Sequence, residues 1–415
     1  MVKIGYLISF PIILALCLSP LTGGTVISGA EHYYAEGSID CVYSAEAEFP
    51  SELNFRLSAE SDAYITDIRL HYTVDRESYA QVTSEVYIEF VPANTVEIEW
   101  SLEMVKIGGL PPGSVVEYWW TVENVNGNRV KTPQVQVRFD DSRYSWHSLT
   151  EGEVTIYWYE GEMSFAEEIM LAAQQALVRL AEDTGAYLKQ PVKIYVYANA
   201  RDLLNALIFP QEWTGGVAFI RHGIIAIGIA PNNLSWGKRA TAHELTHLVN
   251  HQMTFNPYSG MPVWLDEGLA MYSEGELLPH FKSWLDWAVA EDDLISVRSL
   301  ASPFSAYAEQ SYLAYAQSYG LVEFLITSYG QDRMLRLLNT LGEGSTYDGA
   351  LDRVYGFDMD GLDILWREYI NRQYQEVEVT ATSMSSALAQ ILNRLASSLL
   401  PGLPMTAQNW VWRWG

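Results

Sequence analysis

Two histidines and a glutamate are the residues of this sequence whose types and spacing most directly suggest chemistry. His243, Glu244 and His247 lie within the segment TAHELTHLVN, which covers residues 241–250. In a helix, residues four apart share one face, so the two imidazoles can converge on a single metal ion. Glu244 then lies beside the ion, where its carboxylate can accept a proton from a metal-activated water. The spacing therefore predicts a helix, beginning near Ser235, that carries a zinc site.

A histidine pair at this spacing also arises by chance, so a zinc site needs a third protein ligand. The candidate is Glu267, within the segment PVWLDEGLAMY, which predicts a second, shorter helix after a loop that contains prolines and a glycine. The alternative is that His243 and His247 are ordinary core histidines and Glu267 is a surface carboxylate. That alternative explains none of the coincident features of a site with three protein ligands and one open position.

This combination resembles the gluzincin metallopeptidases, whose third zinc ligand is a glutamate on the following helix, as in thermolysin and the aminopeptidase N group. The likeness is strongest to small bacterial proteins called peptidase MA-like, which carry the pattern Trp-Leu-x-Glu-Gly-x-Ala where this chain has residues 264–270. It extends over roughly residues 164–375. The resemblance implies an α+β catalytic domain of the thermolysin-like type that binds one zinc ion per chain. The two histidines and Glu267 would be its ligands, and Glu244 its catalytic base.

The same resemblance implies two further parts of the site. Gluzincins have an edge strand before the metal helix, and we expect residues 224–229, which match its position, to be that edge; such an edge can bind an extended peptide as an added strand. Gluzincins also place a tyrosine or histidine opposite the metal, where it stabilises the developing oxyanion. The candidates here are Tyr312, Tyr315 and Tyr319, of which Tyr315 is preferred, although all three can equally be packing residues.

Three other residues near these motifs have less direct interpretations. Asp266 can orient a ligand histidine through a hydrogen bond, although related aminopeptidases have asparagine there. His251 continues the spacing of four from His247, and we expect it to face solvent or to cap the helix. His222 lies in a predicted turn, and we expect it to be exposed rather than catalytic.

The first part of the chain has a different pattern. Residues 49–139 show apolar side chains with a period of two, which is typical of half-buried strands, and turn signals such as Pro111, Pro112 and Gly113 separate the runs. About six or seven short strands of this kind, with separate runs at 53–57 and 68–74 among them, predict a β-sandwich. This sandwich resembles the immunoglobulin-like and fibronectin type III group in architecture, and that likeness implies no function.

After residues 140–141 the period changes to that of helices. Ser164 and Glu167 form a capping-box pattern at the start of a helix that should end at Gly185. A strand at 192–197, a helix near 202–208 and a hairpin of 217–219 with 224–229 follow. Beyond Ser235 the pattern is mostly helical to Gln375. A small mixed sheet followed by helices predicts an α+β layout.

With 415 residues the chain is long enough for two folded units. We therefore expect a multidomain protein in which an all-β immunoglobulin-like sandwich precedes the α+β catalytic domain. The predicted segments are a signal peptide or anchor at 1–30, the sandwich at 31–141, the catalytic domain at 142–375 and a tail of unknown role at 376–415.

Charge and targeting signals narrow the function class. A formal net charge of -26 with 25 Lys and Arg excludes the basic face of a typical nucleic-acid-binding protein. Lys3, the apolar stretch 4–18 and the small residues up to Ala30 predict a secretory signal, with an uncleaved membrane anchor as the alternative. The two cysteines offer no disulfide framework, and Cys41 is expected to be a small buried residue.

Together these features predict a secreted or extracytoplasmic zinc metallopeptidase, a hydrolase that acts on peptide or protein substrates and is most simply a monomer. Membrane association through the N-terminus and the choice between endopeptidase and aminopeptidase activity stay open. One alternative is a cell-surface binding protein with a non-catalytic zinc site. Another is a zinc hydrolase of a non-peptide bond. The intact motif favours the peptidase.

Overall fold

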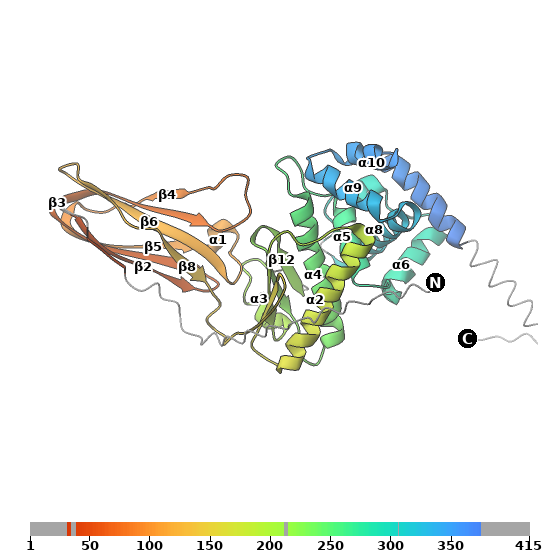
Figure 1. Cartoon of the computed structure of the whole chain (residues 1–415), viewed down its shortest axis with the longest axis horizontal. Helices are drawn as coiled ribbons and strands as arrows, with labels where there is room; N and C mark the ends of the chain where they lie inside the picture. Colours follow the sequence, from red (N-terminus) through yellow and green to blue (C-terminus); the bar gives the residue numbers. More distant parts are fainter. Residues whose placement is uncertain (1–30, 35–38, 211–214, 306, 375–415) are drawn as a thin grey trace, which may run out of the picture.

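The computed structural model describes residues 31–34, 39–210, 215–305 and 307–374. The predicted signal or anchor at 1–30 and the tail at 376–415 lie outside these residues. Within the described part, no helix combines the length and the apolar character needed to cross a lipid bilayer. The chain forms a β unit, residues 31–141, and a helical half, residues 142–374, which lie side by side (Figure 1).

The β unit consists of strands that pair into one sheet. The order along it is β1-β2-β3-β6-β7, with β4 and β5 also paired to β3 and β8 paired to β6. The strands are β1 (Glu31–Tyr34), β2 (Ile39–Glu48), β3 (Glu52–Val74), β4 (Ser84–Tyr87), β5 (Ala93–Glu103), β6 (Ser114–Asn124), β7 (Arg129–Lys131) and β8 (Val135–Phe139), and the short helix α1 (Met104–Ile107) follows β5.

Strand β3 explains how one sheet becomes two layers. The sequence predicts separate strands at 53–57 and 68–74, but the structure has a single strand of 23 residues there. Its first half pairs with β2 and β5, and its second half pairs with β4 and β6, with a register shift between Glu60 and Ile65. The strand bends at this register shift, as a bulged strand does, and the strands lie in two layers (Figure 1). Their buried apolar side chains form one core. Cys41 is buried in this core, as predicted. An immunoglobulin-like topology is not confirmed.

A second sheet lies at the start of the helical half. Its order is β12-β13-β11-β10-β9, with β10, β11 and β13 parallel and the two outer strands antiparallel to their neighbours. The strands are β9 (His147–Glu151), β10 (Val154–Trp158), β11 (Val192–Tyr197), β12 (Gly216–Phe219) and β13 (Ile224–Gly228). The predicted strand at 192–197 and the predicted hairpin are present, whereas β9 and β10 were not predicted. The prediction that residues 224–229 form the edge strand is wrong, because β13 lies between β11 and β12, and β12 has the outer position among the described strands. The hairpin turn contains the 3-10 helix η1 (Ile220–His222).

Helix α2 (Met163–Thr184) crosses over between the parallel strands β10 and β11. It begins one residue before Ser164 and no side chain caps it, so the predicted capping box is wrong. It ends as predicted at Gly185, whose φ of 72° is a left-handed conformation that favours glycine. Helix α3 (Ala200–Leu204) follows β11, and the side chain of Asn199 accepts a hydrogen bond from the backbone N–H of Asp202 at its start.

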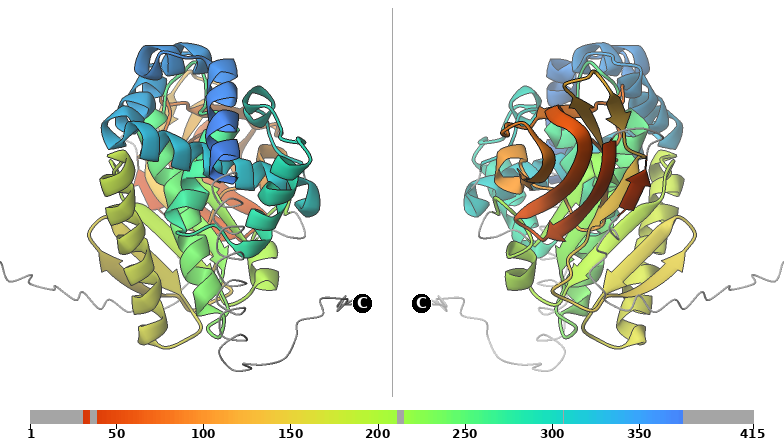
Figure 2. Two further views of the ribbon diagram at one scale, coloured as in Figure 1. Left: turned by 90° about the vertical axis from the view of Figure 1, so that its right-hand side faces the viewer. Right: turned by 90° about the vertical axis from the view of Figure 1, so that its left-hand side faces the viewer.

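The rest of the helical half is built from helices that pack around one apolar cluster, which includes Trp264, Leu321 and Trp366. Figure 2 shows these helices on the side of the molecule opposite the β unit. They are α4 (Leu234–Thr254), α5 (Val263–Ser273), α6 (Pro279–Ala290), α7 (Val297–Leu300), α8 (Ala308–Tyr329), α9 (Gln331–Gly342) and α10 (Tyr347–Tyr355), followed by a helical stretch at 359–374.

The hydrophobic core crosses the predicted boundary near residue 141. Tyr195, Tyr197 and Ile224 of the second sheet belong to the same buried cluster as the core of the β unit. Asp141, which is fully buried, accepts hydrogen bonds from Tyr197 Oη at 3.0 Å and from the guanidinium of Arg143. The two units therefore share part of one core, whereas the sequence predicts a separate core for each.

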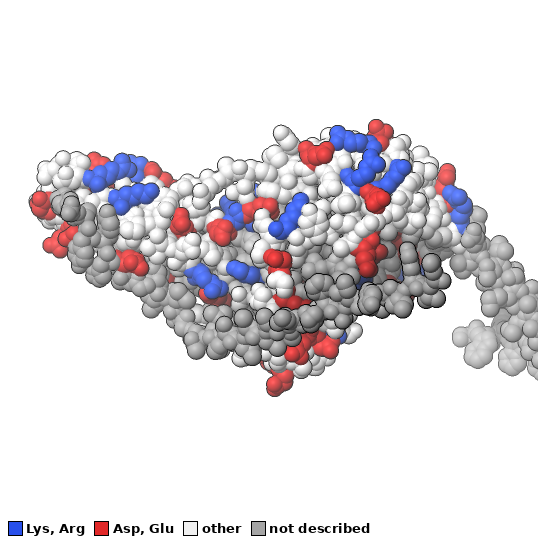
Figure 3. Space-filling model, viewed as in Figure 1, with Lys and Arg blue, Asp and Glu red and all other residues white. Residues whose placement is uncertain are grey.

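Charged side chains are scattered over the molecule. On the face drawn in Figure 3, Lys and Arg are interspersed with Asp and Glu. That face therefore offers no continuous basic surface of the kind that a nucleic-acid backbone would need.

Candidate metal centre

Helix α4 separates an apolar face from a polar one. Ala242, Leu245 and Val249 are buried, as the helical spacing predicts, and Leu245 packs in the cluster that contains the aliphatic face of the second sheet. The other face carries His243 and His247, one turn apart, toward helix α5. The helix is thus fixed by burial of its apolar side, and this burial orients the polar side chains.

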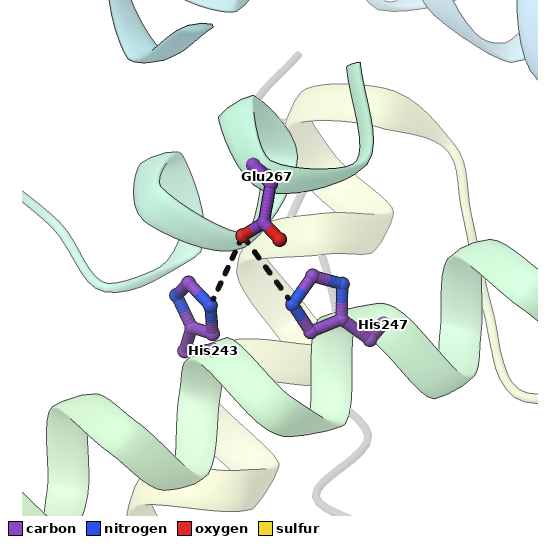
Figure 4. A group of neighbouring side chains, drawn as sticks. All are labelled: His243, His247 and Glu267. Atoms are coloured by element: carbon purple, nitrogen blue, oxygen red, sulfur yellow. Dashed lines mark ion pairs between the residues drawn. The ribbon is translucent and has the colours of Figure 1, made fainter. Parts of the chain in front are cut away.

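The three predicted ligands meet between α4 and α5. His243, His247 and Glu267 each offer one ligand atom, and these atoms lie within 4.8 Å of one another. Figure 4 shows both imidazoles pointing from α4 toward the carboxylate of Glu267 on α5. The Nε2 atoms of His243 and His247 are 3.5 and 3.7 Å from Glu267 Oε2.

This spacing fits a bound metal ion better than direct hydrogen bonding. Glu267 Oε2 is buried, yet it accepts no hydrogen bond from the described residues. A buried carboxylate oxygen without a donor is costly unless a cation compensates it. Two imidazoles and one carboxylate are also a donor set that catalytic zinc sites use, with a fourth position open. The group can therefore hold a metal ion.

Each of these two histidines contacts a further carboxylate through its Nδ1 atom. His243 Nδ1 lies 2.8 Å from Glu274 Oε1, and His247 Nδ1 lies 3.1 Å from Asp266 Oδ2. Such contacts fix the ring orientation and leave Nε2 free for a metal. Asp266 thus has the orienting contact that its position in the sequence suggests, and Glu274 makes an equivalent contact that the sequence does not predict.

Two further side chains hold these carboxylates in place. Asn250 donates a hydrogen bond of 2.8 Å to Asp266, and Arg239 forms an ion pair with Glu274 at 3.1 Å. The signal that could have revealed Glu274 is its spacing: it follows Glu267 by two helical turns and so lies on the same face. Arg239 likewise precedes His243 by one helical turn and so lies on the same face of α4.

Negative charge dominates this group. Burial opposes a positive charge on His243, but the carboxylates of Glu267 and Glu274 outweigh it and hold the pKa of His243 well above its ordinary value. Burial also opposes protonation of His247, yet Asp266 and Glu267 raise its pKa to about 9. A divalent cation would supply the same compensation, and both rings would then be neutral ligands.

Glu244 lies beside the ligand group and against the edge strand β12. Burial raises the pKa of its carboxyl above the ordinary value, partly offset by the two histidines and by a hydrogen bond with the backbone of Ala218. A Cβ added to Gly216 would lie 2.8 Å from Glu244 Oε1. The absence of a side chain at Gly216 therefore lets β12 approach this carboxylate closely.

The three candidate tyrosines on α8 have different surroundings. Burial, followed by the charges of Glu267 and Glu244, raises the pKa of Tyr315, whose ring packs edge-on against Phe304 and Phe281. Tyr319 instead lies beside Tyr272 and places its hydroxyl 3.5 Å from Glu323. Tyr312 packs edge-on against Phe281 and His280.

Gly268 allows helix α8 to pack close to helix α5. A Cβ on Gly268, the residue after Glu267, would lie 2.4 Å from the backbone oxygen of Ser318. Helices α5 and α8 therefore pack backbone to backbone at this point, which brings the helix of Tyr315 beside the helix of Glu267.

Two histidines differ from their expected positions. His251 is not solvent-facing: its side chain is 15% exposed, and its Nε2 lies 3.1 Å from Glu77 of the β unit. His222 is half-buried, and desolvation lowers its pKa to about 4. The sequence predicts both at the surface because a local pattern does not show which distant parts of the chain cover a residue.

Comparison with solved structures gives weak similarities. They include aminopeptidase A of Legionella pneumophila in complex with aspartic acid (11% identity, TM-score 0.34, 76% of this chain and 47% of that chain). OgpA from Akkermansia muciniphila is 9% identical, with a TM-score of 0.20 over 28% of this chain and 31% of that chain. A family 56 carbohydrate-binding module, a beta-1,3-glucan binding domain, is 22% identical, with a TM-score of 0.16 over 24% of this chain and 99% of that chain. No curated protein matches the chain.

The comparison with family models is more informative, because it covers the residues that form the metal centre. Residues 172–372 match the model of the Peptidase MA superfamily. The gluzincin type stays a prediction. The match includes α4, α5 and α8 but not the β unit. The part of the chain that carries the metal centre is thus similar to the Peptidase MA superfamily, which indicates a peptidase and therefore a hydrolase.

Proposed function

We propose that this protein is an extracytoplasmic zinc-dependent peptidase of the gluzincin type. The observation that carries the proposal is the convergence of His243, His247 and Glu267, with Glu244 beside them, inside the segment that matches the Peptidase MA superfamily. The extracytoplasmic location rests on the signal-like pattern at the N-terminus. The three ligands would hold one zinc ion.

Zinc in such a position lowers the pKa of water and polarises a carbonyl group. Glu244 would accept the proton of the attacking water and pass it to the leaving amine. Burial against β12 and the two histidines raises the pKa of its carboxyl, which suits a base that must exchange protons near neutral pH. The carboxylates of Asp266 and Glu274 would keep the two imidazoles correctly oriented.

The edge strand and one tyrosine would complete the site. Among the described strands, β12 is the outermost of its sheet and has β13 on one side, so an extended peptide could pair with its other edge. Tyr315 is the candidate for stabilising the oxyanion, because it is the tyrosine of α8 whose pKa the charges of Glu267 and Glu244 raise. The backbone of β12 would thus bind the substrate, and the side chains of α4, α5 and α8 would act on it.

The decisive experiment compares Glu244→Gln with the wild type in zinc content and peptide hydrolysis. The substitution keeps the size of the side chain and removes the base. We expect full zinc content, an unchanged melting temperature and at least a ~100-fold lower rate of hydrolysis. Glu323→Gln is a matched control, because Glu323 is a second partly buried helical glutamate whose contact is Tyr319 rather than the ligand group.

A protein whose zinc is structural, such as a surface-binding protein, gives the opposite result. In that case neither the wild type nor Glu244→Gln hydrolyses peptides although both bind zinc. Equal hydrolysis by the two proteins, with zinc present in both, would show that Glu244 is not the base.

A further inference from the structure

We infer that a loop of the β unit, residues 75–83, forms one wall of a substrate pocket beside the metal centre. The pocket would bind an aromatic or large aliphatic side chain of the peptide substrate, away from the scissile bond. The inference rests on the proposed peptidase function and adds a specificity element to it. The loop joins β3 to β4 and lies at the end of the β unit that faces α4 (Figure 1).

Three contacts attach the loop to the helical half. The backbone N–H of Glu77 donates a hydrogen bond of 2.7 Å to the carbonyl of Arg221, in the turn of the β12–β13 hairpin. The carboxylate of Glu77 lies 3.1 Å from His251 Nε2 on α4. The ring of Tyr79 stacks on Phe255, with ring centres 4.3 Å apart and planes 6° from parallel. A main-chain hydrogen bond, a close polar contact and a ring stack together hold the loop in one position.

A pocket of about 480 Å³ lies between this loop and the metal centre. His247 and Asp266 line one part of it, and Tyr79 and Phe255 line another. The pocket therefore starts at a predicted ligand of the metal and extends to the β unit. Its volume is within the roughly 300–1,000 Å³ of ligand-binding pockets.

Polar side chains such as Asn250 and Asp266 share the lining with large apolar ones, and the exposed rings favour an apolar occupant. Tyr79 is 51% exposed and Tyr258 is 79% exposed, and both line the pocket together with Met261 and Ile220. Large apolar surfaces left open beside a reaction site gain free energy when a substrate side chain covers them. Aromatic rings add a preference for stacking against another ring. Arg221 also lines the pocket, so an acidic side chain is the competing occupant that an experiment must exclude.

The loop adds to the pocket a side chain, Tyr79, from outside the segment that matches the family model. The family match covers residues 172–372, and the loop at 75–83 lies outside it. Tyr79 would therefore determine specificity without contacting the reacting atoms. Truncating Tyr79 should change which peptides are preferred and leave the chemistry intact.

The test uses the full-length protein with zinc, as wild type, Tyr79→Ala, Tyr79→Phe and Tyr64→Ala. Tyr64 is the matched control, because it is a similarly exposed tyrosine of the β unit at the bend of β3. The substrates are quenched fluorescent peptides that are alanine-based and carry Phe, Leu, Asp or Lys at one position in turn. The measured quantity is kcat/KM for each peptide.

We expect the wild type to prefer Phe or Leu over Ala at one position away from the scissile bond. Tyr79→Ala should reduce this preference roughly 2- to 10-fold, the range for losing one aromatic contact. Tyr79→Phe and Tyr64→Ala should keep the preference, and the alanine peptide should be cleaved equally by all four proteins. An unchanged preference in Tyr79→Ala, or a wild-type preference for Asp, would overturn the inference.

A second readout separates this inference from the proposed function. If the wild type with zinc cleaves none of the peptides, the peptidase proposal fails. Binding of the Phe and Ala peptides to the same proteins, measured by fluorescence anisotropy, then tests whether the pocket binds an aromatic side chain. Tighter binding of the Phe peptide that Tyr79→Ala abolishes supports the pocket, and equal binding of both peptides excludes it.

Discussion

The two faces of the second sheet are built from different kinds of side chain. The face toward helices α2 and α4 is almost entirely aliphatic and includes Ile156, Ile194 and Ile227. The face toward the β unit carries tyrosines instead. Tyr195 and Tyr197 are buried there, and Trp146, Tyr144 and Tyr159 pack around them.

This difference separates two tasks within one sheet. Branched aliphatic side chains need no hydrogen-bond partner, so the helix side can pack tightly and fix α4 with its metal ligands. Buried tyrosines need a partner for the hydroxyl, and Tyr197 finds it in Asp141 at the junction of the two units. We therefore expect changes on the helix side to alter metal binding and rate, and changes on the β side to alter stability.

The largest expected effect is loss of the metal in Glu267→Ala. Wild-type protein should contain about one zinc per chain, and the variant almost none, because two protein ligands hold zinc poorly. His243→Ala and His247→Ala should behave alike. Metal analysis after dialysis measures this, with Glu276→Ala as control because Glu276 is exposed on the same segment. Full zinc content in Glu267→Ala would refute the ligand set.

The next largest effect concerns removal of the β unit. The sequence alone predicts that a fragment starting near residue 141 folds by itself, but the shared cluster predicts otherwise. A fragment of residues 142–374 would expose Tyr195, Ile224 and Ala226, which are at most 2% exposed in the whole chain. At roughly 1.5–3 kcal/mol for each of the two large side chains, this loss is comparable to the lower end of the ~5–15 kcal/mol stability of a typical domain.

We therefore expect this fragment to be insoluble or to melt well below a longer protein of residues 31–374. Thermal unfolding followed by circular dichroism compares the two. If both melt at the same temperature, the tyrosine face does not depend on the β unit, and the contrast between the two faces of the sheet is wrong.

A smaller effect is expected from removing one hydroxyl on the helix side. Tyr315→Phe should reduce kcat about 100-fold with zinc and stability unchanged, the usual effect of losing one oxyanion donor. Tyr312→Phe and Tyr319→Phe should reduce it little, because Tyr319 places its hydroxyl beside Glu323 and the ring of Tyr312 packs against His280. Steady-state kinetics on one peptide compares the three. A large loss in Tyr319→Phe alone would transfer the role to that residue.

The smallest effect is expected from changing a carboxylate that orients a ligand histidine. Asp266→Asn keeps the size of the side chain and removes the charge that faces His247. Zinc affinity should fall roughly 10-fold, the low end for such orienting partners. Competition with a fluorescent chelator measures the affinity. An unchanged affinity would mean that packing alone orients the imidazole of His247.

Several features of the site follow from local sequence. Helical periodicity alone places His243 and His247 on one face of α4, with Ala242, Leu245 and Val249 on the buried face. Gly185 ends α2 because glycine readily adopts a left-handed conformation. The hairpin before α4 and strand β11 also agree with the sequence, because short apolar runs bounded by turn residues are a local property.

Other features were decided only by contacts between distant parts of the chain. Glu274 behind His243, Glu77 beside His251 and the stack of Tyr79 on Phe255 join residues that no local pattern connects. The same holds for β3, where two predicted strands are one, because pairing with four neighbours keeps the whole segment extended.

The sequence by itself thus determined which residues can bind a metal and which elements carry them, because ligand type and helical spacing are local. The tertiary structure decided what surrounds them. Packing of the β unit against the second sheet merges two cores and brings the loop 75–83 to the metal centre. The physical reason is that burial depends on every surface that meets at a site, and most of those surfaces come from elsewhere in the chain.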